Sequence, residues 1–392
     1  MKPINILPPQ IFNMLAAGEV VENPASVVKE CVENSIDAGA TAITVAIKNG
    51  GINQITITDN GHGVEQSQVE KIFLPHATSK ITNANDLESI QTLGFRGEAM
   101  SSIASVSQVT ITTKVRNANM ATRMELSAGD VISKQNIAAS NGTQVVIKNL
   151  FFNIPARKKF LKSANIEKNN VTSCVQKLIL SNPNMSVKYV VDDEIIYNFV
   201  GGGLSNAIKT IFGVEVTQNM LPINTPELSG FVSVPSYTKR NRTWQTAMIN
   251  GRVVSDGIIA DAANDAFSNY MTSGNFPFFV LNLNINFASV DVNVHPRKAE
   301  VHFEDPTQIH QKVKSAITAA IDKHLFERAR VFAPSSTHLP TKVDTPKTDI
   351  AAEIKATLKY FTSQVGQHSV KSAPETMNMF DKKYFSELSP TQ

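Results

Sequence analysis

The chain has only two cysteines, Cys31 and Cys174, in 392 residues. Two thiols cannot build a disulfide framework or a cysteine-rich zinc site. The sequence also has no apolar run of the roughly 18 residues that a membrane-spanning helix needs. Pro3, Pro8 and Pro9 interrupt the first residues, where a signal peptide would need an unbroken apolar core. These absences predict a cytoplasmic protein without a membrane span.

An excess of charge of one sign is also missing. The chain has 37 Lys and Arg residues against 34 Asp and Glu residues, a formal net charge of +3. A nucleic-acid surface would therefore require local clustering of basic side chains. Hydrophobic residues make up 42% of the chain and charged residues 18%, which predicts folded domains with sizeable cores. At roughly 100–200 residues per domain, the length favours two or three domains.

Helix and strand patterns alternate over most of the chain. Asn23 followed by Pro24 predicts the start of a helix, and short runs of alternating apolar and polar residues after it predict strands. We expect an α+β fold with domains at 1–210 and 211–330. Residues 331–392 are rich in Pro, Ser, Thr and Lys, a composition that predicts a largely disordered linker.

The helix that begins at Pro24 has one polar face. At about 100° per residue, Glu30, Glu33, Asn34 and Asp37 share an arc of about 100°. Two interpretations are open on this helix alone. The face is solvated, or it carries a carboxylate that acts as a base beside an amide that ligates Mg²⁺, a hard cation that prefers oxygen ligands.

Glycine-rich loops follow at two places. Asp59 ends a predicted strand just before Gly61 and Gly63, which indicates either an ordinary turn or an acceptor for the amino group of a base. The run GFRG at 94–97 precedes a helix, where backbone N–H groups and the positive helix end can bind an anion. Because the chain contains no Gly-Lys pair, nucleotide binding by a P-loop is excluded.

Several motifs together resemble the GHKL ATPases, in the order typical of that superfamily. After Glu30 they are ENSIDAGA (33–40), DNGHG (59–63), HATSK (76–80), GFRGEA (94–99) and GTQV (142–145). Three longer runs narrow the resemblance to the MutL family of mismatch-repair proteins, up to about residue 327: LPPQIFNMLAAGEVVENPASVVKE (7–30), NIPARKKFLK (153–162) and VDVNVHPRKAEVHF (290–303).

This resemblance implies a fold and a function. The fold is a Bergerat-type α/β sandwich followed by a smaller transducer domain that contains a βαβ unit. The function is ATP-dependent DNA mismatch repair, in which ATP binding and hydrolysis with Mg²⁺ switch a clamp that forms a homodimer. The implied partners are DNA, bound weakly and without sequence preference, a mismatch-sensor protein, a strand-nicking enzyme and a helicase. The implied place is the bacterial nucleoid during repair.

The resemblance also assigns roles to single residues. Glu30 corresponds to the base that activates the attacking water, Asn34 to the Mg²⁺ ligand, and Lys298 to a second-domain lysine that reaches the γ-phosphate. Asp59 matches the residue that binds the adenine amino group. The other expected ATP-binding residues lie beside these two carboxylates, in the ATP lid, in the phosphate loop and next to the adenine: Asp37, Gly61, Gly63, Thr78, Ser79, Lys80, Gly94, Phe95, Arg96, Gly97 and Thr143.

Basic residues gather in two short stretches. They are either charged surface or contacts to DNA phosphates, which would be independent of sequence and sensitive to salt. The candidates are Arg157, Lys158, Lys159 and Lys162 in the first stretch, Lys239, Arg240 and Arg242 in the second, and Arg252 after it.

Other functional classes fit less well. The ATPase subunit of a type II topoisomerase is the main alternative, and PARKKFLK and HPRK argue against it. A histidine kinase would need a phosphoacceptor helix ahead of the ATP site, but only 29 residues precede Glu30. A DNA-binding scaffold with decayed ATP motifs is not expected, because the motif residues are chemically competent. We also expect no endonuclease activity, because no D-Q-H-A-x-x-E-R-type motif is present.

Overall fold

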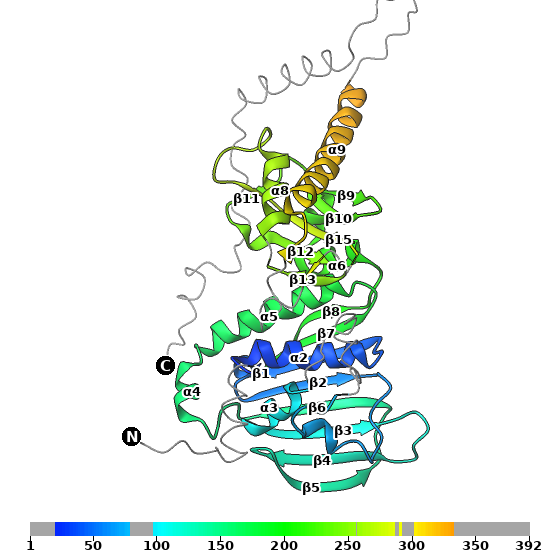
Figure 1. The fold of residues 1–392 in the computed structure, drawn as a ribbon, viewed down its shortest axis with the longest axis vertical. Coiled ribbons are helices and arrows are strands. Elements are labelled where there is room, and N and C mark those ends of the chain that lie inside the picture. The colour runs from blue at the N-terminus through cyan, green and yellow to red at the C-terminus, as the bar shows by residue number, and fades with distance from the viewer. Residues whose placement is uncertain (1–19, 79–96, 256, 287–289, 292–301, 333–392) are drawn as a thin grey trace, which may run out of the picture. The chain divides into compact units, whose positions relative to one another are not determined.

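The computed structural model describes residues 20–78, 97–255, 257–286, 290–291 and 302–332. These residues form two large β-sheets and two short strand pairs, with helices packed on the large sheets, an α+β fold as expected (Figure 1). The predicted linker lies outside the described residues except for its first two. No described helix combines the length and the apolar composition that crossing a bilayer requires.

The first sheet has eight strands in the order β5-β4-β3-β6-β2-β1-β7-β8. Neighbouring strands are antiparallel except for β1 and β7, which are parallel. The strands are β1 Ala42–Lys48, β2 Gln54–Asp59, β3 Gln108–Lys114, β4 Ala121–Ser127, β5 Asp130–Ile137, β6 Gly142–Lys148, β7 Ser186–Val191 and β8 Glu194–Phe199.

Helices cover this sheet because both carry matching apolar surfaces. Every second residue of β1 is buried, namely Ile43, Val45 and Ile47. They share one core with Val27 and Val28 of helix α2 (Pro24–Asp37), and Figure 1 shows α2 and α3 (Ala99–Ser105) over the sheet. The other helices of this part are α4 Pro155–Phe160, α5 Ala164–Ser181, α6 Leu204–Phe212 and α7 Val214–Gln218.

The second sheet has five strands in the order β13-β12-β15-β10-β9. Strands β12 and β15 are parallel, and α8 lies between them in the chain, so this part contains the expected βαβ unit. The elements are β9 Met220–Asn224, β10 Leu228–Ser233, β12 Gln245–Ile249, β13 Arg252–Val254, α8 Gly257–Phe267, β15 Phe279–Leu283 and α9 Pro306–Phe332. Two short pairs complete it, β11 Thr238–Lys239 with β14 Phe276–Pro277 and β16 Val290–Asp291 with β17 His302–Phe303.

The strand β15 is buried on both of its faces. Phe279 and Leu281 belong to a core with helices α8 and α9, whereas Val280 belongs to the core of the first sheet. Next to them, the rings of Phe212 in α6 and Trp244 are 5.3 Å apart between centroids, and both contact Phe278. The end of the first part and one face of the second sheet therefore share a continuous apolar layer.

Candidate functional site

Helix α2 begins where the sequence predicted. Asn23 and Ser26 form a reciprocal capping box, in which the Ser26 backbone N–H donates to Asn23 Oδ1 at 3.0 Å and the Asn23 backbone N–H donates to Ser26 Oγ at 3.3 Å. Glu30 and Asn34 follow on the same face, one turn apart, and both are half-buried. The helix thus presents a carboxylate beside an amide.

The polar face of α2 is not simply solvated. Glu33 is only 8% exposed and accepts a salt bridge from Lys29 at 3.5 Å. Asp37, at the end of the helix, is half-buried like Glu30 and Asn34. Burial of carboxylates costs free energy unless partners compensate for it. The interpretation of a plain solvated face is therefore wrong for this helix.

Asp59, at the end of β2, lies in a network of hydrogen bonds. Its Oδ2 accepts from the hydroxyl of Ser35 in α2 at 2.8 Å. Its Oδ1 accepts from the backbone N–H groups of Gly61 at 2.9 Å and Thr143 at 3.2 Å. Three donors from three different elements fix the orientation of this carboxylate. Each carboxylate oxygen has two lone-pair sites, so further acceptor capacity remains for a ligand.

The far side of this network is built from two threonines. The hydroxyls of Thr113 in β3 and Thr143 in β6 lie 3.0 Å apart, and Thr113 Oγ1 also accepts from the Val64 backbone N–H at 2.9 Å. Thr143, an expected adenine-side residue, is thus brought beside Asp59. Ser35 and Thr113 were missed in the sequence. The available signal was Ser35, a hydroxyl on the otherwise apolar side of α2.

The glycines of the DNGHG loop are buried where the backbone approaches other elements closely. Gly63 has a φ of +72°, and a Cβ atom there would overlap the carbonyl of Lys114. A Cβ atom on Gly61 would lie 2.9 Å from the Ala38 carbonyl oxygen. Larger residues would push this loop away from β3 and from the end of α2.

The two loops expected to bind phosphate meet at their described ends. His76 Nδ1 lies 3.2 Å from Glu98 Oε1. Gly97 packs so closely against Ala77 that a Cβ atom would lie 2.6 Å from its carbonyl oxygen. Thr78, next in the chain, is exposed. The other predicted residues of these loops, and the second-domain lysine, lie outside the described residues: Ser79, Lys80, Gly94, Phe95, Arg96 and Lys298.

Helix α2 holds the candidate base, Glu30, away from Ser35, which donates to Asp59. With a rise of about 1.5 Å per residue, Glu30 and Ser35 are about 7.5 Å apart along the helix axis. No described group of three or more His, Cys, Asp or Glu residues could hold a metal ion. The amide oxygen of Asn34 beside Glu30 fits Mg²⁺ whose other ligands are phosphate oxygens and waters.

The first basic stretch divides into an anchor and an exposed part. Arg157 is half-buried, donates to the backbone carbonyl of Val21 at 3.3 Å, and lies over the ring of Phe151. Lys158, Lys159 and Lys162 are exposed. Only these lysines present their charge openly to a ligand.

The second stretch does not form one basic surface. The Nζ atom of Lys239 lies 4.4 Å from the ring centroids of both Tyr237 and Trp244, so its ammonium group makes cation–π interactions with these rings. Arg242 pairs with Asp261 at 3.3 Å. Arg240 is exposed.

Arg252 lies apart from both stretches, near the acidic face of α2. It is half-buried in β13; burial lowers its pKa, and the charges of Glu33 and Asp37 act in the opposite direction. This environment suits an internal electrostatic contact better than a DNA phosphate.

Comparisons with known proteins agree with this geometry. Residues 22–150 match the family of histidine kinase-, DNA gyrase B-, and HSP90-like ATPases, and residues 208–322 match the C-terminal domain of DNA mismatch repair proteins. In structure, the chain is similar to the N-terminal domain of a DNA repair protein, with a TM-score of 0.68, 24% identity, and coverage of 80% of this chain and 98% of that one. It is also similar to the Aquifex aeolicus MutL ATPase domain complexed with ADP, with a TM-score of 0.54, 24% identity and coverage of 68% and 93%.

The first part of the molecule therefore has the fold of this class of ATPases. Curated relatives identify the family. The DNA mismatch repair protein MutL of Agathobacter rectalis is 41% identical over 326 residues, 82% of this chain and 50% of the relative. MutL of Clostridium botulinum is 36% identical over 402 residues, 100% of this chain and 59% of the relative. The chain belongs to the MutL family of DNA mismatch repair proteins, and it spans about half the length of the curated relatives that it matches.

Proposed function

We propose that this chain binds and hydrolyses ATP and thereby switches a dimerising clamp in DNA mismatch repair. The observation that carries the proposal is the carboxylate of Asp59, which three hydrogen bonds hold beside Ser35 of α2. Glu30 and Asn34 lie on that helix. The match at 208–322 supports a domain boundary near residue 210 and favours mismatch repair over the topoisomerase alternative.

Each of the proposed site residues has a separate role in ATP binding or hydrolysis. Asp59 accepts a hydrogen bond from the adenine amino group, and Thr143 lies on the same side of the base. Glu30 accepts the proton of the attacking water as a general base. The loops that meet at Gly97 and Ala77 enclose the phosphates, with Lys298 supplying charge from the second domain. Such positioning and charge neutralisation are the main needs of phosphoryl transfer.

Mg²⁺ bound to ATP would neutralise charge on the phosphate oxygens, and Asn34 is the residue that would hold it. Asp37 lies one turn beyond Asn34, on the same face of the helix. We propose that Asp37 orients solvent around this position.

The proposed partners follow from the family. They are DNA, bound through the exposed lysines after Pro155, a mismatch-sensor protein, a strand-nicking enzyme and a helicase. A second copy of the chain pairs with it when ATP binds. We place this activity in the bacterial cytoplasm, at the nucleoid during repair.

Substitution of the proposed base tests the catalytic assignment. Glu30→Ala should leave ATP binding intact and lower turnover by about 10²- to 10⁴-fold, the range for loss of a general base. Turnover is measured by phosphate release, and binding by calorimetry with a nonhydrolysable ATP analogue. Glu194→Ala, an exposed glutamate of β8, is the matched control and should keep full turnover. Turnover that survives in Glu30→Ala would disprove the assignment.

A further inference from the structure

Phe160, the last residue of α4, is 86% exposed. No other large hydrophobic residue in the described part of the chain is as exposed; the next are Val200 at 74% and Ile132 at 65%. A phenylalanine ring that meets water on nearly all sides gains nothing from the folded core. Single exposed apolar residues are common on protein surfaces, so the exposure of Phe160 matters because of the lysines that flank it.

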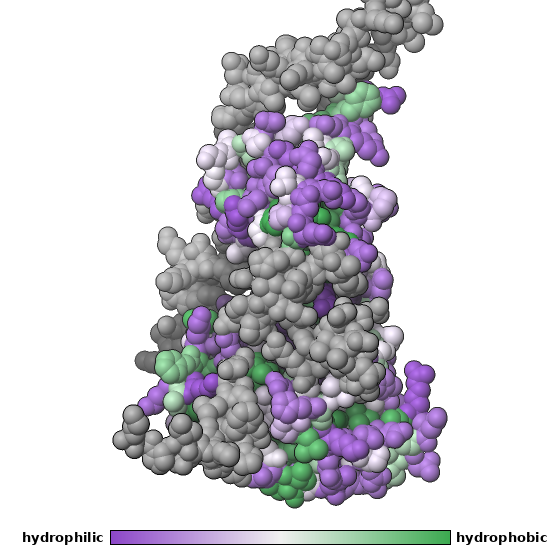
Figure 2. Space-filling model, viewed as in Figure 1, coloured by the Kyte–Doolittle hydropathy of each residue, from purple (hydrophilic) through white to green (hydrophobic). Residues whose placement is uncertain are grey.

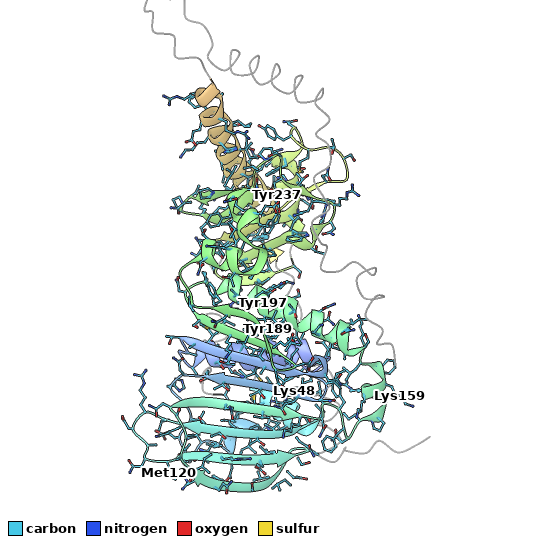
Figure 3. All side chains as sticks on the ribbon, turned by 180° about the vertical axis from the view of Figure 1, so that it is seen from behind. Lys48, Met120, Lys159, Tyr189, Tyr197 and Tyr237 are labelled. Atoms are coloured by element: carbon cyan, nitrogen blue, oxygen red, sulfur yellow. The ribbon has the colours of Figure 1, made fainter. Side chains whose placement is uncertain are left out.

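The helix that carries Phe160 is held in place by a different residue. Arg157, in the middle of α4, donates to the carbonyl of Val21 and lies 5.9 Å from the ring centroid of Phe151, a fully buried residue. Pro155 starts the helix with its φ preset. The helix is therefore fixed to the domain on one side while its remaining residues face solvent, and Figure 3 shows Lys159 on α4 at the margin of the ribbon.

Exposed lysines lie on both sides of Phe160 in the sequence. Lys158, Lys159 and Lys162 are all exposed, and the run PARKKFLK contains no acidic residue. The nearest carboxylate after it, Glu167, is only 2% exposed and accepts hydrogen bonds from the Lys162 backbone N–H and from Asn170. Its charge is turned inward, so the exposed charged side chains of PARKKFLK are all lysines. In Figure 2, apolar and strongly hydrophilic residues lie side by side where α4 projects.

An exposed aromatic ring among lysines matches one ligand class best. Aromatic rings stack on unpaired bases, and lysines follow the phosphates of the same strand. A duplex offers phosphates to the lysines but keeps its bases stacked in the helix, out of reach of a ring on the surface. An acidic protein partner would use the lysines but would not need the flat face of the ring.

We propose that Phe160 is a stacking platform for an unpaired base and that α4 thereby favours single-stranded over duplex DNA. This inference rests on the proposed function, because it specifies the form of DNA that the site takes.

Binding of fluorescent oligonucleotides by the full chain tests the inference. A single-stranded oligothymidine and a duplex of equal length are titrated at two salt concentrations, with anisotropy as the readout. Phe160→Ala should weaken single-strand binding by about 5- to 150-fold, the range for loss of one stacked base, and leave duplex binding and both salt slopes unchanged. Lys159→Ala should weaken the binding of both ligands. It should also lower the slope of log K against log salt concentration by about 0.7 for the single strand and about 0.9 for the duplex.

Two further variants separate stacking from apolar contact. Phe160→Leu keeps an apolar side chain without a π face, so it should behave like Phe160→Ala. Ile132→Ala removes another exposed apolar side chain, 65% exposed, from β5 and should leave the binding of both ligands unchanged. Since all three positions are exposed, thermal unfolding should be unaltered and confirm that the variants are folded.

Several outcomes would overturn the inference. The first is an equal loss of affinity for single strand and duplex in Phe160→Ala, and the second is unchanged single-strand affinity in Phe160→Leu. The third is a change of solution mass in Phe160→Ala, which would show that the ring is a contact between copies. If the unaltered chain bound no DNA at all, the DNA part of the proposed function would fail as well. If it bound both ligands and Phe160 were irrelevant, only the stacking inference would fail.

Discussion

At the scale of single residues, the most informative group is the carboxylate of Asp59. Its partners come from α2, from its own loop and from β6, so contacts within the protein fix the orientation of this carboxylate. Preorganised acceptors of this kind bind without further ordering of the side chain. The two cysteines are inert by comparison, because burial raises the pKa of both Cys31 and Cys174 to about 12 and keeps them protonated near neutral pH.

Asp59→Asn tests the proposed adenine contact with little change of shape. The amide oxygen can still accept from Gly61 and Thr143, and the amide NH₂ group can face the Ser35 hydroxyl, which turns to accept. The acceptor for the adenine amino group is then lost. Nucleotide affinity should fall by about 10- to 150-fold, as expected for a hydrogen bond to a charged group, and the melting temperature should change little. Calorimetric titration measures the affinity.

The control for this substitution is Asp130→Asn on the exposed edge strand β5, which should bind nucleotide normally. Unchanged affinity in Asp59→Asn would remove Asp59 from the adenine site.

The sequence motifs predicted Glu30, Asn34 and Asp59 as site residues, whereas Ser35 and Thr113 were missed. The first three belong to runs that resemble a known family. Thr113 has a buried hydroxyl whose partners, Val64 and Thr143, are 49 and 30 residues away in the chain. No local pattern signals such a contact.

At the scale of elements, a helix or strand could be predicted from the sequence when the residues that determine it lie within its own segment. Helix α2 was predicted because Asn23, Pro24 and its apolar stripe are all contained in the segment itself. Strand β5 was not predicted, because it lies at the edge of the sheet and its residues are mostly exposed, without alternation of apolar and polar positions. Its structure depends on pairing with β4, which a sequence pattern does not show.

Arg252 links two elements that are distant in the chain, β13 and α2. Glu33 is buried and already pairs with Lys29, so removal of Arg252, a second cation near it, should cost more than removal of a surface partner. A double-mutant cycle of Arg252→Ala and Glu33→Gln should give a coupling energy of about 0.5–3 kcal/mol, measured by urea unfolding. The exposed pair Arg123 and Glu125, which are 2.7 Å apart, should give about 0.2–1 kcal/mol in the same cycle.

A coupling no larger than that of the surface pair would mean that Arg252 does not stabilise α2. Normal DNA binding by Arg252→Ala, together with reduced ATP turnover, would further separate this role from a phosphate contact.

At the scale of the whole molecule, the α+β class and the βαβ unit of the second part were predicted correctly. The packing between the two sheets was not predicted. It depends on Phe212, Trp244 and Phe278, which are apolar residues like any other in the sequence and meet only through the fold. Side chains on the two faces of β15 belong to different cores, so the two parts of the molecule are in direct contact at this strand.

This shared packing gives the proposed ATP switch a physical basis. Glu30 and Lys298 are far apart in the sequence, and both are proposed to act on the phosphates of ATP. Closure around ATP would then stabilise one arrangement of the two parts through contacts made only in that state. Light scattering with a nonhydrolysable ATP analogue and Mg²⁺ should show the solution mass doubling relative to the free chain. Lys298→Ala should still bind the analogue but stay monomeric, whereas Lys188→Ala, an exposed lysine of β7, should dimerise normally. A constant mass with nucleotide demonstrably bound would show that the ATP site does not drive pairing of this chain, and would leave Lys298 with a role in hydrolysis alone.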